Sequence, residues 1–163
     1  MKNIVLIGMP GAGKSTIGVL LAKSMLMDFV DTDLIIQRST GKPLCEIIKD
    51  AGIDAFIKIE NDTICDENFV NSVIATGGSA VYGKKAMEKL KSEGVIVYLK
   101  VDACELKNRI KNIHTRGIAM KEGQSLDSLY NERAPLYEAY ADITIESGGI
   151  TPEECVDLII EKL

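Results

Sequence analysis

The chain has 163 residues, of which 46% are hydrophobic and 26% are charged, and its formal net charge is −5. These values indicate one globular domain, long enough to bury about two-thirds of its unfolded surface. The negative charge and scattered basic residues argue against a nucleic-acid partner, since duplex binding normally requires a basic face.

No apolar stretch is as long as a membrane span. The apolar run that follows Met1 and Lys2 stops at Gly8, which is too short for the core of a signal peptide. The four cysteines are widely spaced without a C-x-x-C pair, and a single histidine cannot complete a zinc cluster. We therefore expect a cytoplasmic monomer with reduced thiols and no membrane partner.

The most informative stretch is residues 8–16, which fit the phosphate-binding pattern G-x-x-x-x-G-K-[ST]. Glycines allow the backbone to wrap around a phosphate without Cβ clashes, so that several N–H groups can point inward. The apolar run 3–7 before the loop is typical of a buried strand, and the apolar positions after it follow a helical period. Strand, glycine loop and helix together predict a site for nucleotide phosphates.

Within this loop, each residue type has a separate expected role. Lys14 can reach the β- and γ-phosphates, and the Ser15 hydroxyl can bind Mg²⁺. The expected nucleotide-binding residues in the loop are Gly11, Ala12, Gly13, Lys14, Ser15 and Thr16.

A pair of carboxylates, Asp31 and Asp33, follows the next expected strand, residues 28–31. Open α/β sheets bind ligands at the carboxyl ends of their strands, so both side chains can face the same crevice. One carboxylate would hold Mg²⁺ and the other would orient a hydroxyl. The alternative is that Asp33 caps the helix expected over 34–39.

Helices are then expected over 44–50 and 54–66, which is more chain than a plain crossover between neighbouring strands needs. We interpret residues 33–66 as a helical insertion that builds a substrate pocket. The strand expected over 72–76 ends in Gly77 and Gly78, where paired glycines allow close approach of a ligand.

Strands are also expected over 94–99 and 142–145, with helices over 84–92, 102–113, 125–140 and 151–162. The sequence Thr151-Pro152-Glu153-Glu154 is a strong helix start. Alternation of strands and helices predicts an α/β fold, a five-stranded parallel sheet covered on both faces. Residues 114–123 are expected to form a lid flanked by glycines, with Arg116 as the lid arginine, unless that residue is only a solvated surface group.

In order and spacing, these motifs resemble those of the shikimate kinase family over nearly the whole chain. The residues that carry the resemblance are 8–16, Asp31 and Asp33, Phe56 with Glu60, 76–78, Arg109 and Arg116 seven residues apart, 132–137 and 141–142.

The resemblance implies a P-loop kinase that transfers the γ-phosphoryl group of ATP, with Mg²⁺, to the 3-hydroxyl of shikimate. It implies that Lys14, Asp33 and Arg116 are catalytic, that Ser15 and Asp31 serve Mg²⁺, and that Arg109 contacts adenine. The implied substrate-binding positions are Asp33, Ile57, Glu60, Gly77, Gly78, Ser79 and Arg133, the last of these holding the substrate carboxylate. Whether Asp33 acts as a base or only orients the hydroxyl is open.

Two positions depart from the family pattern. Ile57 stands where the family has an arginine that clamps the shikimate carboxylate, and Ser79 stands in place of a third glycine. Lys58 lies about 100° further round the helix and is no obvious replacement. Because a charge-assisted hydrogen bond contributes about 1.5–3 kcal/mol, the loss of one clamp predicts roughly ten- to a hundred-fold weaker shikimate binding.

Three alternatives to a shikimate kinase follow from these departures. The first is a related kinase whose substrate is a less anionic cyclic or polyhydroxy compound. The second is a regulatory nucleotide-binding protein without turnover, which the retained Lys14, Asp31 and Asp33 disfavour. A nucleoside monophosphate kinase would need a basic pocket for a second phosphate, and Ile57 removes positive charge.

Overall fold

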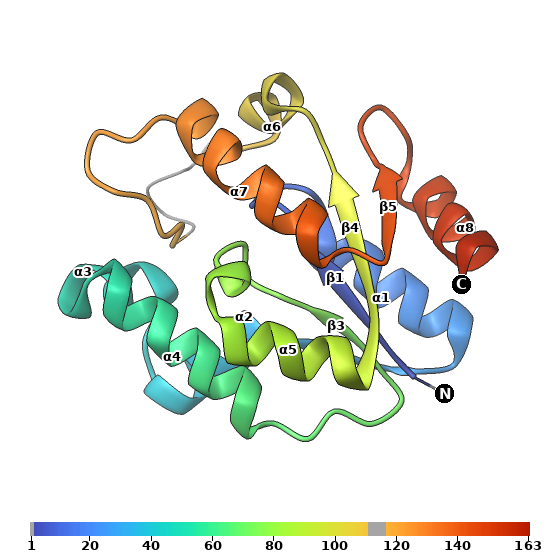
Figure 1. The fold of residues 1–163 in the computed structure, drawn as a ribbon, viewed down its shortest axis with the longest axis horizontal. Helices are drawn as coiled ribbons and strands as arrows, with labels where there is room; N and C mark the ends of the chain where they lie inside the picture. The colour runs from blue at the N-terminus through green and yellow to red at the C-terminus, as the bar shows by residue number, and fades with distance from the viewer. Residues whose placement is uncertain (1, 111–116) are drawn as a thin grey trace.

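The computed structural model describes residues 2–110 and 117–163, and within these ranges five parallel strands form one sheet (Figure 1). The order across the sheet is β2 (Asp28–Asp31), β3 (Ser72–Ala75), β1 (Asn3–Ile7), β4 (Gly94–Lys100) and β5 (Ile143–Glu146). The predicted five-stranded parallel sheet is confirmed. β1 and β3 are buried along their whole length, which explains their continuous apolar runs.

The register of the sheet brings the ends of β1, β2 and β3 to one edge. Leu6 in β1 and Asp31 in β2 both lie opposite Ala75, the last residue of β3. The phosphate loop, the Asp31–Asp33 segment and the glycines after β3 therefore start from neighbouring points in space.

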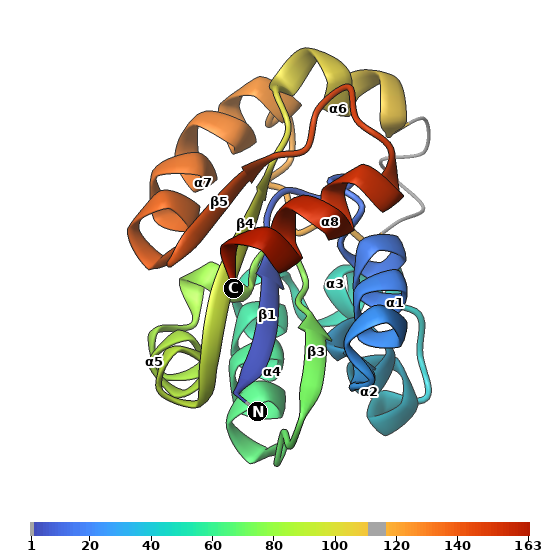
Figure 2. The same ribbon diagram turned by 90° about the vertical axis from the view of Figure 1, so that its right-hand side faces the viewer.

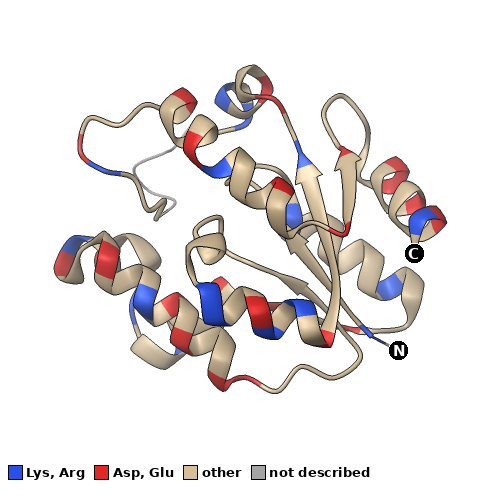
Figure 3. Ribbon diagram, viewed as in Figure 1, with Lys and Arg blue, Asp and Glu red and all other residues tan. Residues whose placement is uncertain are grey.

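Helices cover both faces of the sheet. Figure 2 shows α1 (Lys14–Met25) and α8 (Pro152–Lys162) on one side and α5 (Lys84–Glu93) and α7 (Leu126–Tyr140) on the other. Acidic and basic residues are interspersed along the outer helices in the view of Figure 3. Among the described residues, no helix is long and apolar enough to cross a membrane.

Three helices connect β2 to β3, in the region where the sequence predicted a helical insertion. They are α2 (Thr32–Thr40), α3 (Leu44–Ala51) and α4 (Ile53–Asp66). They share a small apolar cluster of their own, which also receives Ala119 from the segment that precedes α7. The insertion therefore contacts Ala119, which lies within the predicted lid.

Several predicted boundaries are wrong. Helix α6 (Ala103–Arg109) ends at Arg109, because Ile110 leaves the helical conformation, and residues 111–113 of the expected helix lie outside the described residues. Asp31, and not Asp33, caps α2, since its Oδ1 accepts a hydrogen bond from the Asp33 N–H at 3.0 Å. A short 3₁₀ helix, η1 (Ala80–Tyr82), was not predicted.

Candidate active site

The phosphate loop has the backbone that its glycines require. Gly13 has φ +94°, a left-handed conformation that favours glycine, and a Cβ on Gly8 would lie 2.7 Å from the Leu99 carbonyl oxygen. The Lys14 side chain folds back over the loop, where its Nζ donates to the carbonyl oxygens of Gly8 and Met9 at 2.8 and 2.9 Å. Burial lowers the pKa of Lys14 to about 8, although the nearby Asp33 opposes that shift.

Ser15 and Asp31 face each other at the start of α1. The Ser15 hydroxyl donates to Asp31 Oδ2 at 2.7 Å, while the other Asp31 oxygen caps α2. Two hard oxygen ligands beside a phosphate loop fit Mg²⁺, which keeps several waters and takes its other ligands from phosphate. Among the described residues, no cluster of three or more His, Cys, Asp or Glu side chains could hold a metal alone.

A cavity of about 300 Å³ opens beside the phosphate loop, and we call it the substrate cavity. It combines the loop with residues from the insertion, the end of β3, the segment before α7 and α7 itself. The predicted site residues that line it are Gly13, Lys14, Ser15, Thr16, Asp33, Gly77, Gly78, Ser79 and Arg133. Phe56, Thr76 and Ala119 complete its wall together with others.

Asp33 is the carboxylate that lines this cavity. Burial, and then the charge of Asp31, raise its pKa to about 6, while Lys14 opposes the rise. A carboxylate with such a pKa is ionised at neutral pH yet close to the range in which it can accept a proton. Asp33 is therefore suited to receive a hydrogen bond from a hydroxyl in the cavity.

The glycines after β3 are held by side chains that the sequence did not single out. Gly77 donates its N–H to the Thr32 hydroxyl oxygen at 3.2 Å, and the Tyr137 hydroxyl donates to the Gly78 carbonyl at 2.6 Å. A Cβ on Gly77 would lie 2.2 Å from Glu60 Oε1, so a larger residue there would require the buried Glu60 side chain to move. Thr32 gave no signal beyond its place between two aspartates, and Tyr137 only its place in the family-like segment.

Glu60 lies behind the cavity wall. It is 1% exposed, and its Oε2 accepts a hydrogen bond from the Ser79 hydroxyl at 2.5 Å. Burial raises the Glu60 pKa to about 7, although the Ser79 bond opposes this rise. The carboxylate thus acts on the cavity through Ser79 and Gly77.

Arg133 is fully buried in α7, and its guanidinium reaches the cavity. Its Nη2 donates to the Ala119 carbonyl at 2.7 Å and its Nε donates to the Tyr82 hydroxyl at 3.3 Å. The Tyr82 ring also lies beneath the guanidinium, 5.3 Å from it. The hydroxyl of Tyr82 in turn donates to Glu132 at 2.5 Å. These contacts fix the guanidinium of Arg133 beside Gly78 in the wall of the cavity.

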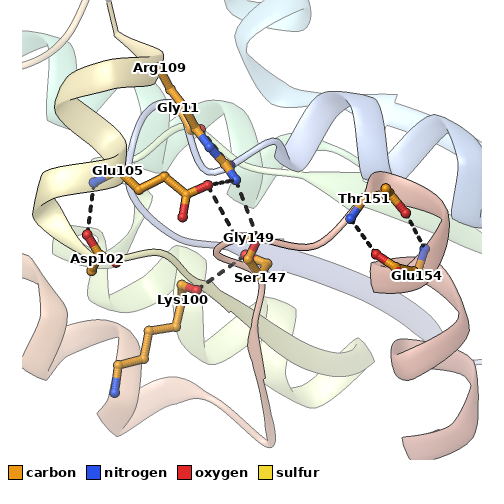
Figure 4. A network of polar contacts seen from close by, with 9 residues as sticks. All are labelled: Gly11, Lys100, Asp102, Glu105, Arg109, Ser147, Gly149, Thr151 and Glu154. Carbon is orange, nitrogen blue, oxygen red and sulfur yellow. Dashed lines mark hydrogen bonds and ion pairs between the residues drawn. The ribbon is translucent and has the colours of Figure 1, made fainter.

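A second cavity, of about 260 Å³, also borders the phosphate loop, and we call it the Arg109 cavity. Gly11, Gly13 and Thr16 line it with Arg109 and the 147–152 segment that connects β5 to α8. Arg109 forms an ion pair with Glu105 and donates to the carbonyl oxygens of Gly11 and Ser147, both at 3.4 Å (Figure 4). Glu105 was not predicted from the sequence.

The remaining predicted site residues have different outcomes. Ala12 is buried within the phosphate loop and lines neither cavity. Ile57 is half-buried on α4 and is also absent from the lining of the substrate cavity, although its neighbour Phe56 contributes to it. Arg116 lies outside the described residues.

Comparison with known proteins agrees with this geometry. The family model described as shikimate kinase matches residues 10–163. The chain belongs to the shikimate kinase family. The family suggested by the motifs is thus confirmed, and with it the prediction of an ATP- and Mg²⁺-dependent P-loop kinase.

Individual relatives show how far the similarity extends. A shikimate kinase of Thermodesulfovibrio yellowstonii is 39% identical over 99% of this chain and 95% of its own length. A Thermobifida fusca shikimate kinase is 34% identical over 98% of this chain and 93% of its own length.

Among solved structures, shikimate kinase from Acinetobacter baumannii in complex with shikimate superposes with a TM-score of 0.91. It is 31% identical and covers 99% of this chain and 92% of its own. A deoxyadenosine kinase from M. mycoides, 14% identical over 98% of this chain and 97% of its own, has a TM-score of 0.60 and so shares the fold alone.

Proposed function

We propose that this protein transfers the γ-phosphoryl group of ATP to the 3-hydroxyl of shikimate. The observation that carries the proposal is the substrate cavity, where Lys14, Asp33 and Arg133 face one space beside the phosphate loop. ATP supplies the phosphoryl group, and Mg²⁺ neutralises charge on its phosphates. Catalysis of such a transfer consists mainly of positioning and charge stabilisation, which buried, fixed side chains can provide.

Each residue has a proposed task. Residues 11–16 bind the phosphates through backbone N–H groups, and Ser15 and Asp31 hold Mg²⁺. Asp33 accepts a hydrogen bond from the reacting hydroxyl, either as its base or as an orienting group. Arg133 binds the carboxylate of the substrate, since a guanidinium pairs with a carboxylate through two parallel hydrogen bonds.

The Arg109 cavity is the proposed place for the adenine base. It adjoins the phosphate loop, where Gly13 and Thr16 line both cavities, and the planar guanidinium of Arg109 can stack on an aromatic face. We also propose that residues 33–66 form the substrate-binding insertion and that residues 113–124 act as a lid that includes Arg116. All of these parts belong to one domain, and the protein acts as a monomer in the cytoplasm.

Release of ADP by the purified protein, with ATP, Mg²⁺ and shikimate, tests the proposal directly. We expect turnover that depends on shikimate, and ³¹P NMR of the product should show a phosphate ester. A panel of hydroxy acids and polyols serves as the comparison, because Ile57 replaces the family's carboxylate-clamping arginine. A better substrate within that panel would replace shikimate, while bound ATP without any turnover would favour the regulatory alternative.

The variant Ile57→Arg tests how much this departure from the family pattern weakens shikimate binding. If the new guanidinium reaches the substrate carboxylate, the KM for shikimate should fall roughly ten-fold or more, since a charge-assisted hydrogen bond is gained. Lys58→Arg, which changes an exposed cation on the same helix, is the matched control and should leave KM unchanged.

A further inference from the structure

Ser79 stands between the substrate cavity and the buried carboxylate of Glu60. It precedes η1 in a right-handed conformation, lines the cavity and is only 4% exposed. Its hydroxyl donates to Glu60 Oε2 at 2.5 Å. The Ser79 side chain is therefore fixed by a hydrogen bond to a residue behind the cavity wall.

The direction of this hydrogen bond is fixed by what surrounds Glu60. Above its pKa of about 7, Glu60 is ionised and can only accept hydrogen bonds, and its Oε1 has no partner within the described residues. Nor does any described cation lie within ion-pair distance of Glu60. If the Ser79 hydroxyl turned away, both buried oxygens would lack a donor, which carries the full desolvation penalty of the charge.

This restriction determines what Ser79 can offer to a ligand. A serine hydroxyl has one hydrogen to donate and two lone pairs that accept. With the hydrogen directed to Glu60, only the lone pairs remain for the cavity. We propose that Ser79 is a specificity-determining residue, which accepts a hydrogen bond from a non-reacting hydroxyl of the alcohol substrate and disfavours a carboxylate at this wall.

The charges around the cavity also separate a side suited to hydroxyl groups from a side suited to a carboxylate. A Cβ on Gly77 would lie 2.2 Å from Glu60 Oε1 and 2.8 Å from Asp33 Oδ1, so both carboxylates crowd the same side of this glycine. A Cβ on Gly78 would lie 3.0 Å from Arg133 Nη1. One wall is thus negative and suited to hydroxyl donors, while the next residue along the chain adjoins the cation suited to a carboxylate.

This inference rests on the proposed function, and substrate analogues test it. The KM values of shikimate, 4-deoxyshikimate and 5-deoxyshikimate, which all keep the reacting 3-hydroxyl, are measured for the parent protein and for Ser79→Ala. For the parent, we expect one deoxy analogue to have a KM about 3- to 10-fold above that of shikimate, the range for one hydrogen bond.

In Ser79→Ala, the KM of shikimate should rise to the value of that analogue, whose own KM should stay the same, with kcat little changed. Equal increases for shikimate and both analogues would overturn the role of Ser79, because a general distortion of the cavity weakens all three substrates alike.

Two further variants serve as controls for the role of the Ser79 hydroxyl. Ser79→Gly removes the same hydroxyl and should collapse the same preference, which keeps the test valid if the alanine variant folds poorly. Ser72→Ala is the matched control, since this buried serine at the start of β3 donates to the Val70 carbonyl at 2.8 Å, remote from the substrate cavity.

The two proposals fail in different ways. A parent protein that neither binds shikimate nor releases ADP with it would overturn the proposed function, and this role of Ser79 with it. A parent that turns shikimate over, but shows the same preference among the three substrates before and after Ser79→Ala, would overturn only the inference about Ser79.

Discussion

Glu105 holds Arg109 one helical turn further along α6 and also accepts a hydrogen bond from the Gly149 N–H at 3.3 Å (Figure 4). One carboxylate therefore connects the guanidinium of the Arg109 cavity to the segment between β5 and α8. Its own backbone is fixed as well, because Asp102 accepts from the Glu105 N–H at 2.8 Å. The proposed adenine site is thus built by a residue that lies outside its lining.

Glu105→Gln tests this relationship. The amide retains a hydrogen-bond acceptor but loses the charge that fixes Arg109, so we expect the KM for ATP to rise about 3- to 10-fold while the KM for shikimate stays the same. Glu93→Gln is the matched control, because Glu93 pairs with Lys89 across the same helical spacing, with their charged groups 3.0 Å apart. Equal KM values for ATP in the two variants would contradict a positioning role.

Asp33 predicts opposite effects of acid on activity and on stability. Activity should fall as pH drops through about 6, since the role proposed for Asp33, to receive the substrate hydroxyl, requires the ionised carboxylate. The folded state, however, binds this proton more tightly than the unfolded chain, where the pKa is near 3.8. The free energy of unfolding of the ligand-free protein should therefore rise as pH is lowered from about 6 towards 4.

Asp33→Asn separates this contribution from those of other groups. Urea unfolding at pH 5 and pH 7.5 should show a smaller pH dependence for the variant than for the parent, and kcat should be lower by several orders of magnitude. Glu60, with a pKa of about 7, adds to stability in the same direction, so Glu60→Gln should also flatten the curve. Unchanged pH dependence in both variants would show that these carboxyl groups are not buried as described.

Tyr82 supports Arg133 through both its hydroxyl and its ring. Tyr82→Phe keeps the ring but removes the hydroxyl that accepts from Arg133 Nε and donates to Glu132. We expect the KM for shikimate to rise about 3- to 10-fold, with no change in the KM for ATP. Tyr140→Phe, at the end of α7, is the control. An equal change in both KM values would indicate a general loss of structure instead.

The Ser15–Asp31 pair predicts how the protein responds to magnesium. Chelation of Mg²⁺ should abolish ADP release, and Ser15→Ala should raise the Mg²⁺ concentration at half-maximal activity, because one proposed oxygen ligand is removed. Ser24→Ala, an exposed serine in the same helix, should behave like the parent. A normal Mg²⁺ dependence in Ser15→Ala would exclude this serine from the metal site.

The sequence by itself determined the sheet, the phosphate loop and the expected Asp31–Asp33 pair, because each depends on residues that are contiguous or a few positions apart. A buried strand needs a continuous apolar run, and the phosphate loop needs glycines at fixed spacing. Family resemblance extended this to Arg109 and Arg133. Helix ends were less certain, as Arg109 in α6 shows, since a single residue such as Ile110 can leave the helix without a sequence signal.

Tertiary structure alone decided how the side chains of the site are held. Ser79 meets Glu60 across 19 residues, Glu105 meets Gly149 across 44, and Tyr137 meets Gly78 across 59. None of these pairs has the spacing of neighbours on a helix or strand, so no local sequence pattern predicts that they are in contact. Their partners are brought together by the order of strands in the sheet, which places the Ser79 hydroxyl 2.5 Å from the buried Glu60 carboxylate.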